Sequence, residues 1–149
     1  MTLTDTHTHL YSEQFSEDRD AVIERSIKAG IQHFFIPAID SEYTRSMLDL
    51  EAAYPKNIFL MMGLHPTHVK ENVEEELTLV KEWLDKRTFY AVGEIGMDLY
   101  WDRTFVKEQQ YAFQTQIQWA KEKQIPINIH CREAFEEVFE ILEKEKDAA

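Results

Sequence analysis

Apolar positions along this chain follow two alternating periods. One alternating stretch and four short apolar runs are typical of strands, and a segment with apolar residues at helical spacing follows each of them. The strand-like runs are residues 2–8, 33–36, 58–62, 89–92 and 125–129. The helix-like segments are residues 18–29, 41–54, 72 to at least 84, 105–123 and 134–146. The pattern therefore predicts the order βαβαβαβαβα.

Residues that commonly end or begin helices support these boundaries. Gly30 is well placed to terminate the first helix, and Pro55 stops the second. Asn72, with Glu75 three residues later, resembles the capping box that opens a helix.

Alternating strands and helices imply parallel strands covered by helices, which fits an open doubly wound sheet or part of a (β/α)8 barrel. Polar residues favour the barrel, because His7, His9, Glu94 and His130 fall at the C-terminal ends of the first, fourth and fifth predicted strands. Barrel active sites are built from those strand ends. We therefore expect an α/β fold of the TIM-barrel type with its first five βα units, and residues 1–149 as the N-terminal portion of one domain.

Composition places the chain among ordinary globular proteins. The first ten residues contain neither the basic region nor the apolar stretch of a secretory signal, and no run reaches the roughly 18 apolar residues of a membrane span. With one cysteine, no internal disulfide can form. We expect a cytoplasmic protein with no membrane partner.

The charge balance limits how nucleic acid could be bound. Twenty-eight acidic residues against 16 basic ones give a formal charge of −12, which argues against tight, salt-driven binding to phosphates. Bound metal ions can still supply positive charge locally, so a nucleic-acid substrate is not excluded.

The histidines at the strand ends indicate a metal site. His7 and His9 are two residues apart, so on a strand their imidazoles point to the same side. Imidazole suits Zn, Mn, Fe, Co and Ni, and a carboxylate such as Glu94 can bridge two ions. His130 ends an apolar run and needs a ligand or a hydrogen bond if it is buried. The ordinary alternatives are surface histidines at 7 and 9 and a satisfied core histidine at 130.

Four motifs together resemble the TatD-related deoxyribonuclease family of amidohydrolase-like metal-dependent hydrolases. They are Asp-Thr-His-Thr-His-Leu at residues 5–10, Gly-Leu-His-Pro at 63–66, Gly-Glu-Ile-Gly-Met-Asp-Leu-Tyr-Trp at 93–101 and Ile-His-Cys-Arg-Glu-Ala at 129–134. The motifs occur in the family's order and span nearly the whole chain.

The resemblance implies a role for each matching residue. His7 and His9 match the ligands of one metal, Glu94 the bridging carboxylate that also serves catalysis, and His130 a ligand of the second metal. Divalent Zn, Mn, Mg, Co or Ni would occupy the site, with up to two ions in the complete family site. Three further residues match positions near the substrate: His65, Arg132 as a phosphate contact, and Asp98, which orients a ligand or water.

Each of these three residues also has an ordinary structural interpretation. Arg132 fits a solvated loop charge, Asp98 a helix or turn cap, and His65 before Pro66 a turn residue.

Length sets the remaining expectations. A (β/α)8 barrel takes roughly 250 residues, whereas five βα units are found here. The resemblance implies a further histidine on strand six and an aspartate on strand eight, which orients or deprotonates the attacking water. Without them we expect at most one tightly bound ion and little or no nuclease activity from these 149 residues. Open sheet edges favour self-association.

Three functional hypotheses remain. The first, implied by the resemblance, is phosphodiester hydrolysis, most specifically 3′–5′ exonuclease action on DNA. The second is hydrolysis of an amide, lactone or deaminase-type substrate within the wider superfamily. Glu94 stands at the end of strand four, where related enzymes place a carboxylated lysine, and this favours the nuclease type. The third is a catalytically silent fragment that acts by protein association.

Overall fold

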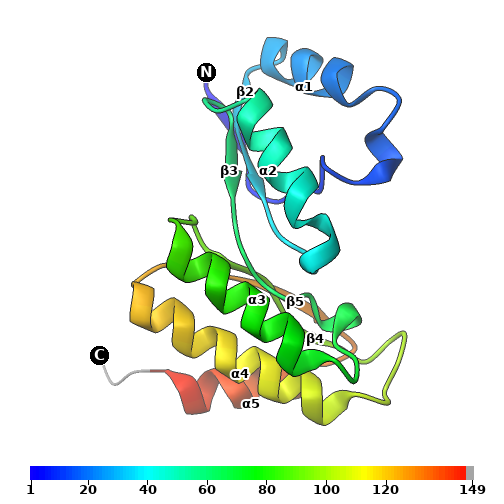
Figure 1. The fold of residues 1–149 in the computed structure, drawn as a ribbon, viewed down its shortest axis with the longest axis vertical. Helices are drawn as coiled ribbons and strands as arrows, with labels where there is room; N and C mark the ends of the chain where they lie inside the picture. The colour runs from blue at the N-terminus through cyan, green and yellow to red at the C-terminus, as the bar shows by residue number, and fades with distance from the viewer. Residues whose placement is uncertain (147–149) are drawn as a thin grey trace.

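The computed structural model describes residues 1–146, in which strands and helices alternate as the sequence pattern predicts (Figure 1). The strands are β1 (Leu3–Asp5), β2 (Ile31–Ile36), β3 (Ile58–Leu60), β4 (Val92–Asp98) and β5 (Ile127–Arg132). The helices are α1 (Arg19–Lys28), α2 (Thr44–Ala53), α3 (Val73–Lys86), α4 (Val106–Lys123) and α5 (Phe135–Glu145). Short 3₁₀ turns are η1 (Glu13–Phe15), η2 (Ser41–Tyr43) and η3 (Pro66–His68).

All strand pairs are parallel, which confirms the predicted α/β class. One sheet has the order β1-β2-β3, and a second pairs β4 with β5. A single parallel bridge between Met62 and Val92 joins them. The continuous five-stranded sheet expected from the sequence is therefore divided. Backbone hydrogen bonds still link Leu60 and Met62 to residues 90–93, and Ala38, just after β2, bonds to Gly93 and Glu94 at the point where the regular ladder is interrupted.

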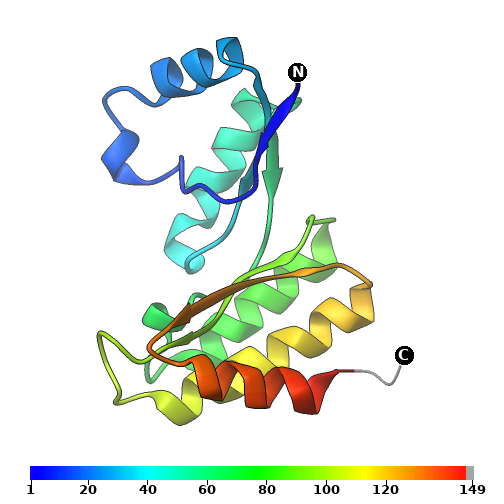
Figure 2. The ribbon, with the colours of Figure 1, turned by 180° about the vertical axis from the view of Figure 1, so that it is seen from behind.

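The helices α2, α3 and α4 pack on one side of the strands. Figure 1 shows these helices in front of the strands, and the reverse view in Figure 2 shows the strands in front of them. The apolar core lies in this layer, where several side chains are almost fully buried: Ile36, Met47, Leu60, Ile95, Met97 and Phe113. No helix among residues 1–146 is long and apolar enough to cross a membrane.

The opposite face of the strands carries aromatic side chains. Phe35 and Phe59 are register partners on β2 and β3, and their ring centroids lie 5.3 Å apart. The ring of Tyr90, which is 48% exposed, packs edge-on against both.

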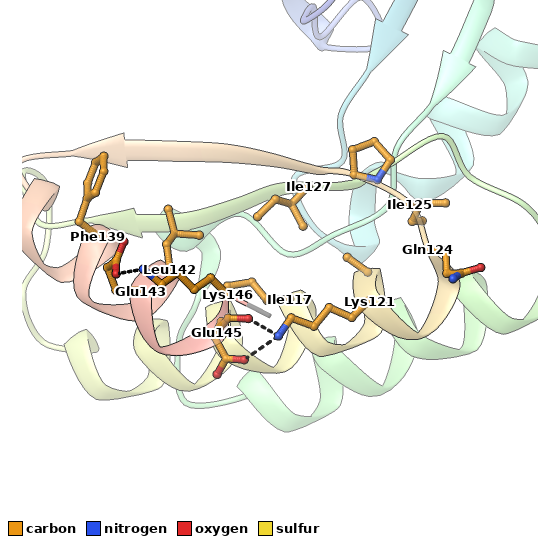
Figure 3. Close-up of a pocket in the computed structure, with 12 residues that line it drawn as sticks. Ile117, Lys121, Gln124, Ile125, Ile127, Phe139, Leu142, Glu143, Glu145 and Lys146 are labelled. Atoms are coloured by element: carbon orange, nitrogen blue, oxygen red, sulfur yellow. Dashed lines mark hydrogen bonds and ion pairs between the residues drawn. The ribbon is translucent and has the colours of Figure 1, made fainter. Parts of the chain in front are cut away.

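An apolar groove lies at the other end of the fold, between α4, β5 and α5 (Figure 3). Ile117, Ile127 and Leu142 line it. Beside it, Phe135 and Phe139 of α5 are 68% and 50% exposed. The edge of the second sheet is therefore markedly apolar where it meets solvent.

The helices begin and end close to the residues predicted from the sequence, but one predicted capping interaction is not formed. Gly30 has φ of +108°, in the region that glycine adopts without strain, and its N–H bonds to Ile27 O at the end of α1. The capping box predicted for Asn72 and Glu75 is wrong. Asn72 is the residue before α3, but its side chain accepts no capping hydrogen bond because its backbone (φ −87°, ψ 21°) is not extended as a capping box requires.

The strand boundaries differ more from the predicted ones, and the differences change where the site residues lie. The first strand ends at Asp5, so His7 and His9 lie in the loop after it instead of on it. The fourth and fifth strands start later and continue further than residues 89–92 and 125–129. Glu94 and Asp98 consequently lie within β4, and His130 within β5. The apolar pattern did not extend through β4 because β4 contains polar residues, although all seven of its residues are buried.

Gly96 is required for the close approach of β4 and β5. Its φ is +138°, and a Cβ there would lie 2.0 Å from His130 O. We expect Gly96→Ala to prevent folding or to lower the free energy of unfolding by about 3 kcal/mol or more, because strain and a backbone clash add together. Chemical denaturation monitored by circular dichroism measures this loss. A destabilisation as small as that of an ordinary strand Gly→Ala change would contradict the geometry.

Candidate metal centre

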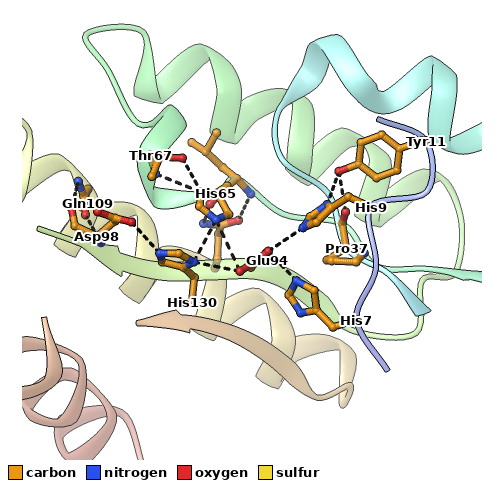
Figure 4. Close-up of polar contacts among 12 residues, drawn as sticks. His7, His9, Tyr11, Pro37, His65, Thr67, Glu94, Asp98, Gln109 and His130 are labelled. Atoms are coloured by element: carbon orange, nitrogen blue, oxygen red, sulfur yellow. Dashed lines mark hydrogen bonds and ion pairs between the residues drawn. The ribbon is translucent and has the colours of Figure 1, made fainter. Parts of the chain in front are cut away.

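The site is built around Glu94, whose side chain is almost completely buried on β4. Four imidazoles surround its carboxylate (Figure 4). His7 Nε2 and His9 Nε2 lie 3.0 Å and 3.2 Å from Glu94 Oε2. On the other oxygen, His130 Nδ1 and His65 Nε2 lie 3.1 Å and 3.5 Å from Oε1.

These atoms form two groups of three donors that share one carboxylate. The first is His7, His9 and Glu94, and the second is His65, Glu94 and His130, with the donor atoms of each group within 4.8 Å of one another. Imidazole nitrogen and carboxylate oxygen are ligands that Zn, Mn, Co and Ni accept. The donor set therefore fits divalent metal binding.

Hydrogen bonds away from Glu94 decide which nitrogen of His9 carries its proton. The Tyr11 hydroxyl donates its one proton to the Pro37 carbonyl at 2.8 Å. It must therefore accept from His9 Nδ1, which lies 2.9 Å away. Neutral His9 then carries its proton on Nδ1 and turns the Nε2 lone pair toward Glu94. Metal-ligating histidines are oriented by this kind of outer hydrogen bond.

His130 is held in the same way from the opposite side. Its Nε2 lies 2.8 Å from Asp98 Oδ2, and a carboxylate can only accept, so the Nε2 proton points to Asp98. The remaining nitrogen, Nδ1, faces Glu94 Oε1. Asp98 is fully buried and is itself fixed by Gln109 through both backbone groups.

Lone pairs of His9 and His130 therefore face the two oxygens of a carboxylate. Two acceptors about 3 Å apart repel each other unless a proton or a metal cation lies between them. Burial by itself would lower the pKa of His130, but Glu94 and Asp98 outweigh it and raise that pKa. A divalent cation would compete with a proton for the position between His130 and Glu94.

The electrostatics of Glu94 follow from the same contacts. Burial would raise its pKa, but the neighbouring imidazoles of His130, His65 and His9 outweigh burial and hold the pKa far below its ordinary value. Glu94 therefore stays an anion throughout the physiological range. Burial raises the pKa of Tyr11, helped by the charge of Glu94, so the phenol keeps the proton that it gives to Pro37.

His65 differs from the other imidazoles. The Thr67 backbone N–H donates to His65 Nδ1 at 3.2 Å, so this nitrogen must accept and the ring proton sits on Nε2. Burial lowers the pKa of His65 against the pull of Glu94, which favours the neutral ring. The geometry thus gives His65 an N–H directed into the site, 3.2 Å from His130 Nδ1 and 3.5 Å from Glu94 Oε1, where His9 and His130 present lone pairs.

All the predicted site residues except Arg132 join this network. Arg132 lies at the end of β5, where its guanidinium carbon is 3.9 Å from the centroid of the Tyr100 ring. The Asp98 carboxylate caps a turn, which was its ordinary structural alternative, and also contacts the site. It accepts hydrogen bonds from the N–H groups of Tyr100 and Trp101, and it contacts His130.

Sequence reasoning missed three supporting side chains. Tyr11 orients His9, while Gln109 and Gln116 are buried on one face of α4 and bind the backbone at Asp98 and Leu64, respectively. Two glutamines seven residues apart on the core-facing side of a helix were the available signal, since a buried amide needs partners.

Replacing Asp98 tests whether this outer contact matters. In Asp98→Asn an amide N–H₂ can face His130 Nε2, which would move the ring proton to Nδ1 and block the lone pair directed at Glu94. We expect metal affinity to fall about 10- to 100-fold, measured by isothermal titration calorimetry. Asp102→Asn, in the same loop but bonded to Thr104, is the matched control. Equal affinities for the two variants would show that Asp98 is a loop cap only.

Comparison with known proteins identifies the family of this chain. The sequence model of the family described as TatD related DNase matches residues 4–149. An uncharacterised metal-dependent hydrolase of Bacillus subtilis, YabD, is 34% identical over 96% of this chain and 56% of its own length. The 3′-5′ ssDNA/RNA exonuclease TatD of Erwinia tasmaniensis is 32% identical over 93% of this chain and 53% of its own.

A solved structure has a similar fold. The crystal structure of YjjV, a TatD homolog from Escherichia coli K12, superposes with a TM-score of 0.87 at 29% identity, over 96% of this chain and 56% of that one. The chain spans about half the length of the relatives it matches. On the family match over residues 4–149, this chain belongs to the TatD-related DNase family.

Proposed function

We propose that the protein is a metal-dependent hydrolase of phosphodiester bonds that removes nucleotides from the 3′ end of DNA. The single observation that carries the metal site is the Glu94 carboxylate, both of whose oxygens face imidazole lone pairs fixed from outside. Family membership and the relative named a 3′-5′ ssDNA/RNA exonuclease support the substrate class.

In this proposal, residues with a free lone pair or a carboxylate bind metal, and residues with a free N–H bind substrate phosphate. His7, His9 and Glu94 hold one divalent ion, and Glu94 and His130 contribute to a second position. Bound metal would lower the pKa of a water molecule and offset phosphate charge. His65 Nε2–H and the Arg132 guanidinium act as donors to substrate phosphate oxygens, and Asp98 keeps His130 oriented.

We also propose that residues 1–149 are the N-terminal portion of one barrel domain. The parallel strands, the helices on one side and the aromatic opposite face support this assignment. Further βα units would cover Phe35, Phe59 and the edge at β5.

The test is a degradation assay on 5′-labelled single-stranded DNA, performed with the whole protein that contains this chain and with added Mg²⁺, Mn²⁺, Co²⁺ or Zn²⁺. The proposal predicts products that shorten stepwise from the 3′ end and disappear with a chelator. Amide or lactone hydrolysis without any DNA cleavage would favour the second enzymatic hypothesis and overturn this one.

Self-association of the isolated 149 residues is a separate proposal with its own observation. The Phe135 and Phe139 rings lie 4.5 Å apart on α5 and are largely exposed beside the apolar groove. We expect these residues to pair two copies of the chain, because such an apolar edge favours association. Sedimentation should show a dimer that Phe139→Glu converts to monomer. A wild-type chain that stays monomeric at every concentration tested would refute it.

A further inference from the structure

An arginine and two aromatic rings meet beside the metal centre, on the side of His130. The Arg132 guanidinium carbon lies 3.9 Å from the Tyr100 ring centroid and 5.1 Å from that of Trp101. The two rings are nearly perpendicular, with centroids 4.8 Å apart. Tyr100 is 53% and Trp101 69% exposed, so the rings form an open corner and are not loop packing hidden from solvent.

Arg132 differs from every other arginine of the chain. The other five each donate to a carboxylate or a backbone carbonyl: Arg19, Arg25, Arg45, Arg87 and Arg103. Within residues 1–146 the Arg132 side chain has ring contacts but no hydrogen bond or ion pair. Its N–H donors are therefore available to an outside anion, in a protein whose net charge is −12.

The corner is tied to the catalytic site by one buried carboxylate. Asp98 Oδ1 accepts from the N–H groups of Tyr100 and Trp101 at 3.0 Å and 3.3 Å, while Oδ2 contacts His130 at 2.8 Å. Arg132 is the register partner of Asp98, two residues after His130 on β5. Asp98 thus fixes Tyr100 and Trp101 relative to His130.

We infer that Tyr100, Trp101 and Arg132 form a nucleotide subsite in which an unpaired base stacks on Trp101 and Arg132 binds an adjacent phosphate. This inference rests on the proposed function and assigns the place where an unpaired base of its substrate would bind. A π-face accepts any base, so the subsite is sequence-tolerant. Bases paired and stacked in a duplex cannot reach the ring without unstacking.

Binding, measured without turnover, tests the inference separately from hydrolysis. The probes are a short oligothymidylate and the same oligomer with abasic sugars, titrated against the 149-residue chain at low ionic strength with fluorescence anisotropy. Trp101→Ala should weaken oligothymidylate binding about 5- to 150-fold and leave abasic binding unchanged. Arg132→Gln should weaken both. Trp101→Phe, which keeps a ring, should retain most of the affinity, and Tyr111→Ala controls for an exposed aromatic elsewhere.

Two results would overturn the subsite. One is unchanged oligothymidylate binding by Trp101→Ala, and the other is equal losses with both probes. Failure of the proposed function looks different: the whole protein would not cleave DNA even though base-dependent binding at Trp101 persists.

Discussion

The 149 residues alone should cleave single-stranded DNA at least about 100-fold more slowly than a version extended with the family's remaining βα units. Phosphodiester hydrolysis needs a water molecule that is activated and held in line with the leaving oxygen. The donors in this chain are imidazoles and one shared carboxylate. Glu94 cannot also be the general base, because its pKa is held far below its ordinary value by the surrounding histidines despite burial.

We expect less precise metal placement to slow the isolated residues further. In the described residues His7, His9 and Glu94 supply three donors to one position, and Glu94 and His130 supply two to the other, so a metal there would sit less firmly than with a complete ligand set. The comparison uses equal concentrations of the short chain, its His7→Ala variant and the extended protein, with product lengths resolved on a gel. If the short chain matches the extended protein and His7→Ala eliminates its activity, the remaining units are not essential.

Glu94→Gln in the whole protein should abolish metal-dependent hydrolysis. The substitution keeps the shape of the side chain but removes the charge and places an N–H₂ donor against imidazole lone pairs. Because both donor groups contain Glu94, the loss should exceed the roughly 10- to 100-fold that removal of one outer contact costs. Initial rates over a range of metal concentrations measure it.

A substitution at another carboxylate controls for a general effect of Glu→Gln on folding. Glu51 is partly buried and pairs with Arg87 through two short contacts, at 2.6 Å and 2.7 Å. Glu51→Gln should retain full activity. If Glu94→Gln keeps more than a tenth of the wild-type rate at saturating metal, the carboxylate is not shared between two essential sites.

The order of strands and helices could be predicted because each element has its own apolar period. Residues 105–123, with Phe113 and Ile117 on one face, were recognised almost to the residue as α4. β4 could not be bounded in this way, because its buried residues include Glu94 and Asp98. Burial of charge depends on partners from distant segments, which a local pattern does not contain.

The sequence indicates which residues come together around Glu94 better than it indicates how they are arranged. His7 and His9 do converge on one oxygen of Glu94, but from a loop after β1, so the strand-period argument for them was wrong. The proton positions on His9, His65 and His130 depend on Tyr11, Thr67 and Asp98, contacts that only the fold creates. The metal identity, the residue roles and the cytoplasmic location stay predictions.

Equilibrium dialysis of the metal-free 149-residue chain against Mn²⁺ or Zn²⁺, followed by elemental analysis, tests the metal centre most directly. We predict one tightly held ion per chain, bound through His7, His9 and Glu94 with His130 nearby, lost in Glu94→Gln and kept in Glu51→Gln. Two tightly held ions per chain would contradict the predicted stoichiometry. No bound ion, or binding that Glu94→Gln leaves intact, would contradict the assignment of the site itself.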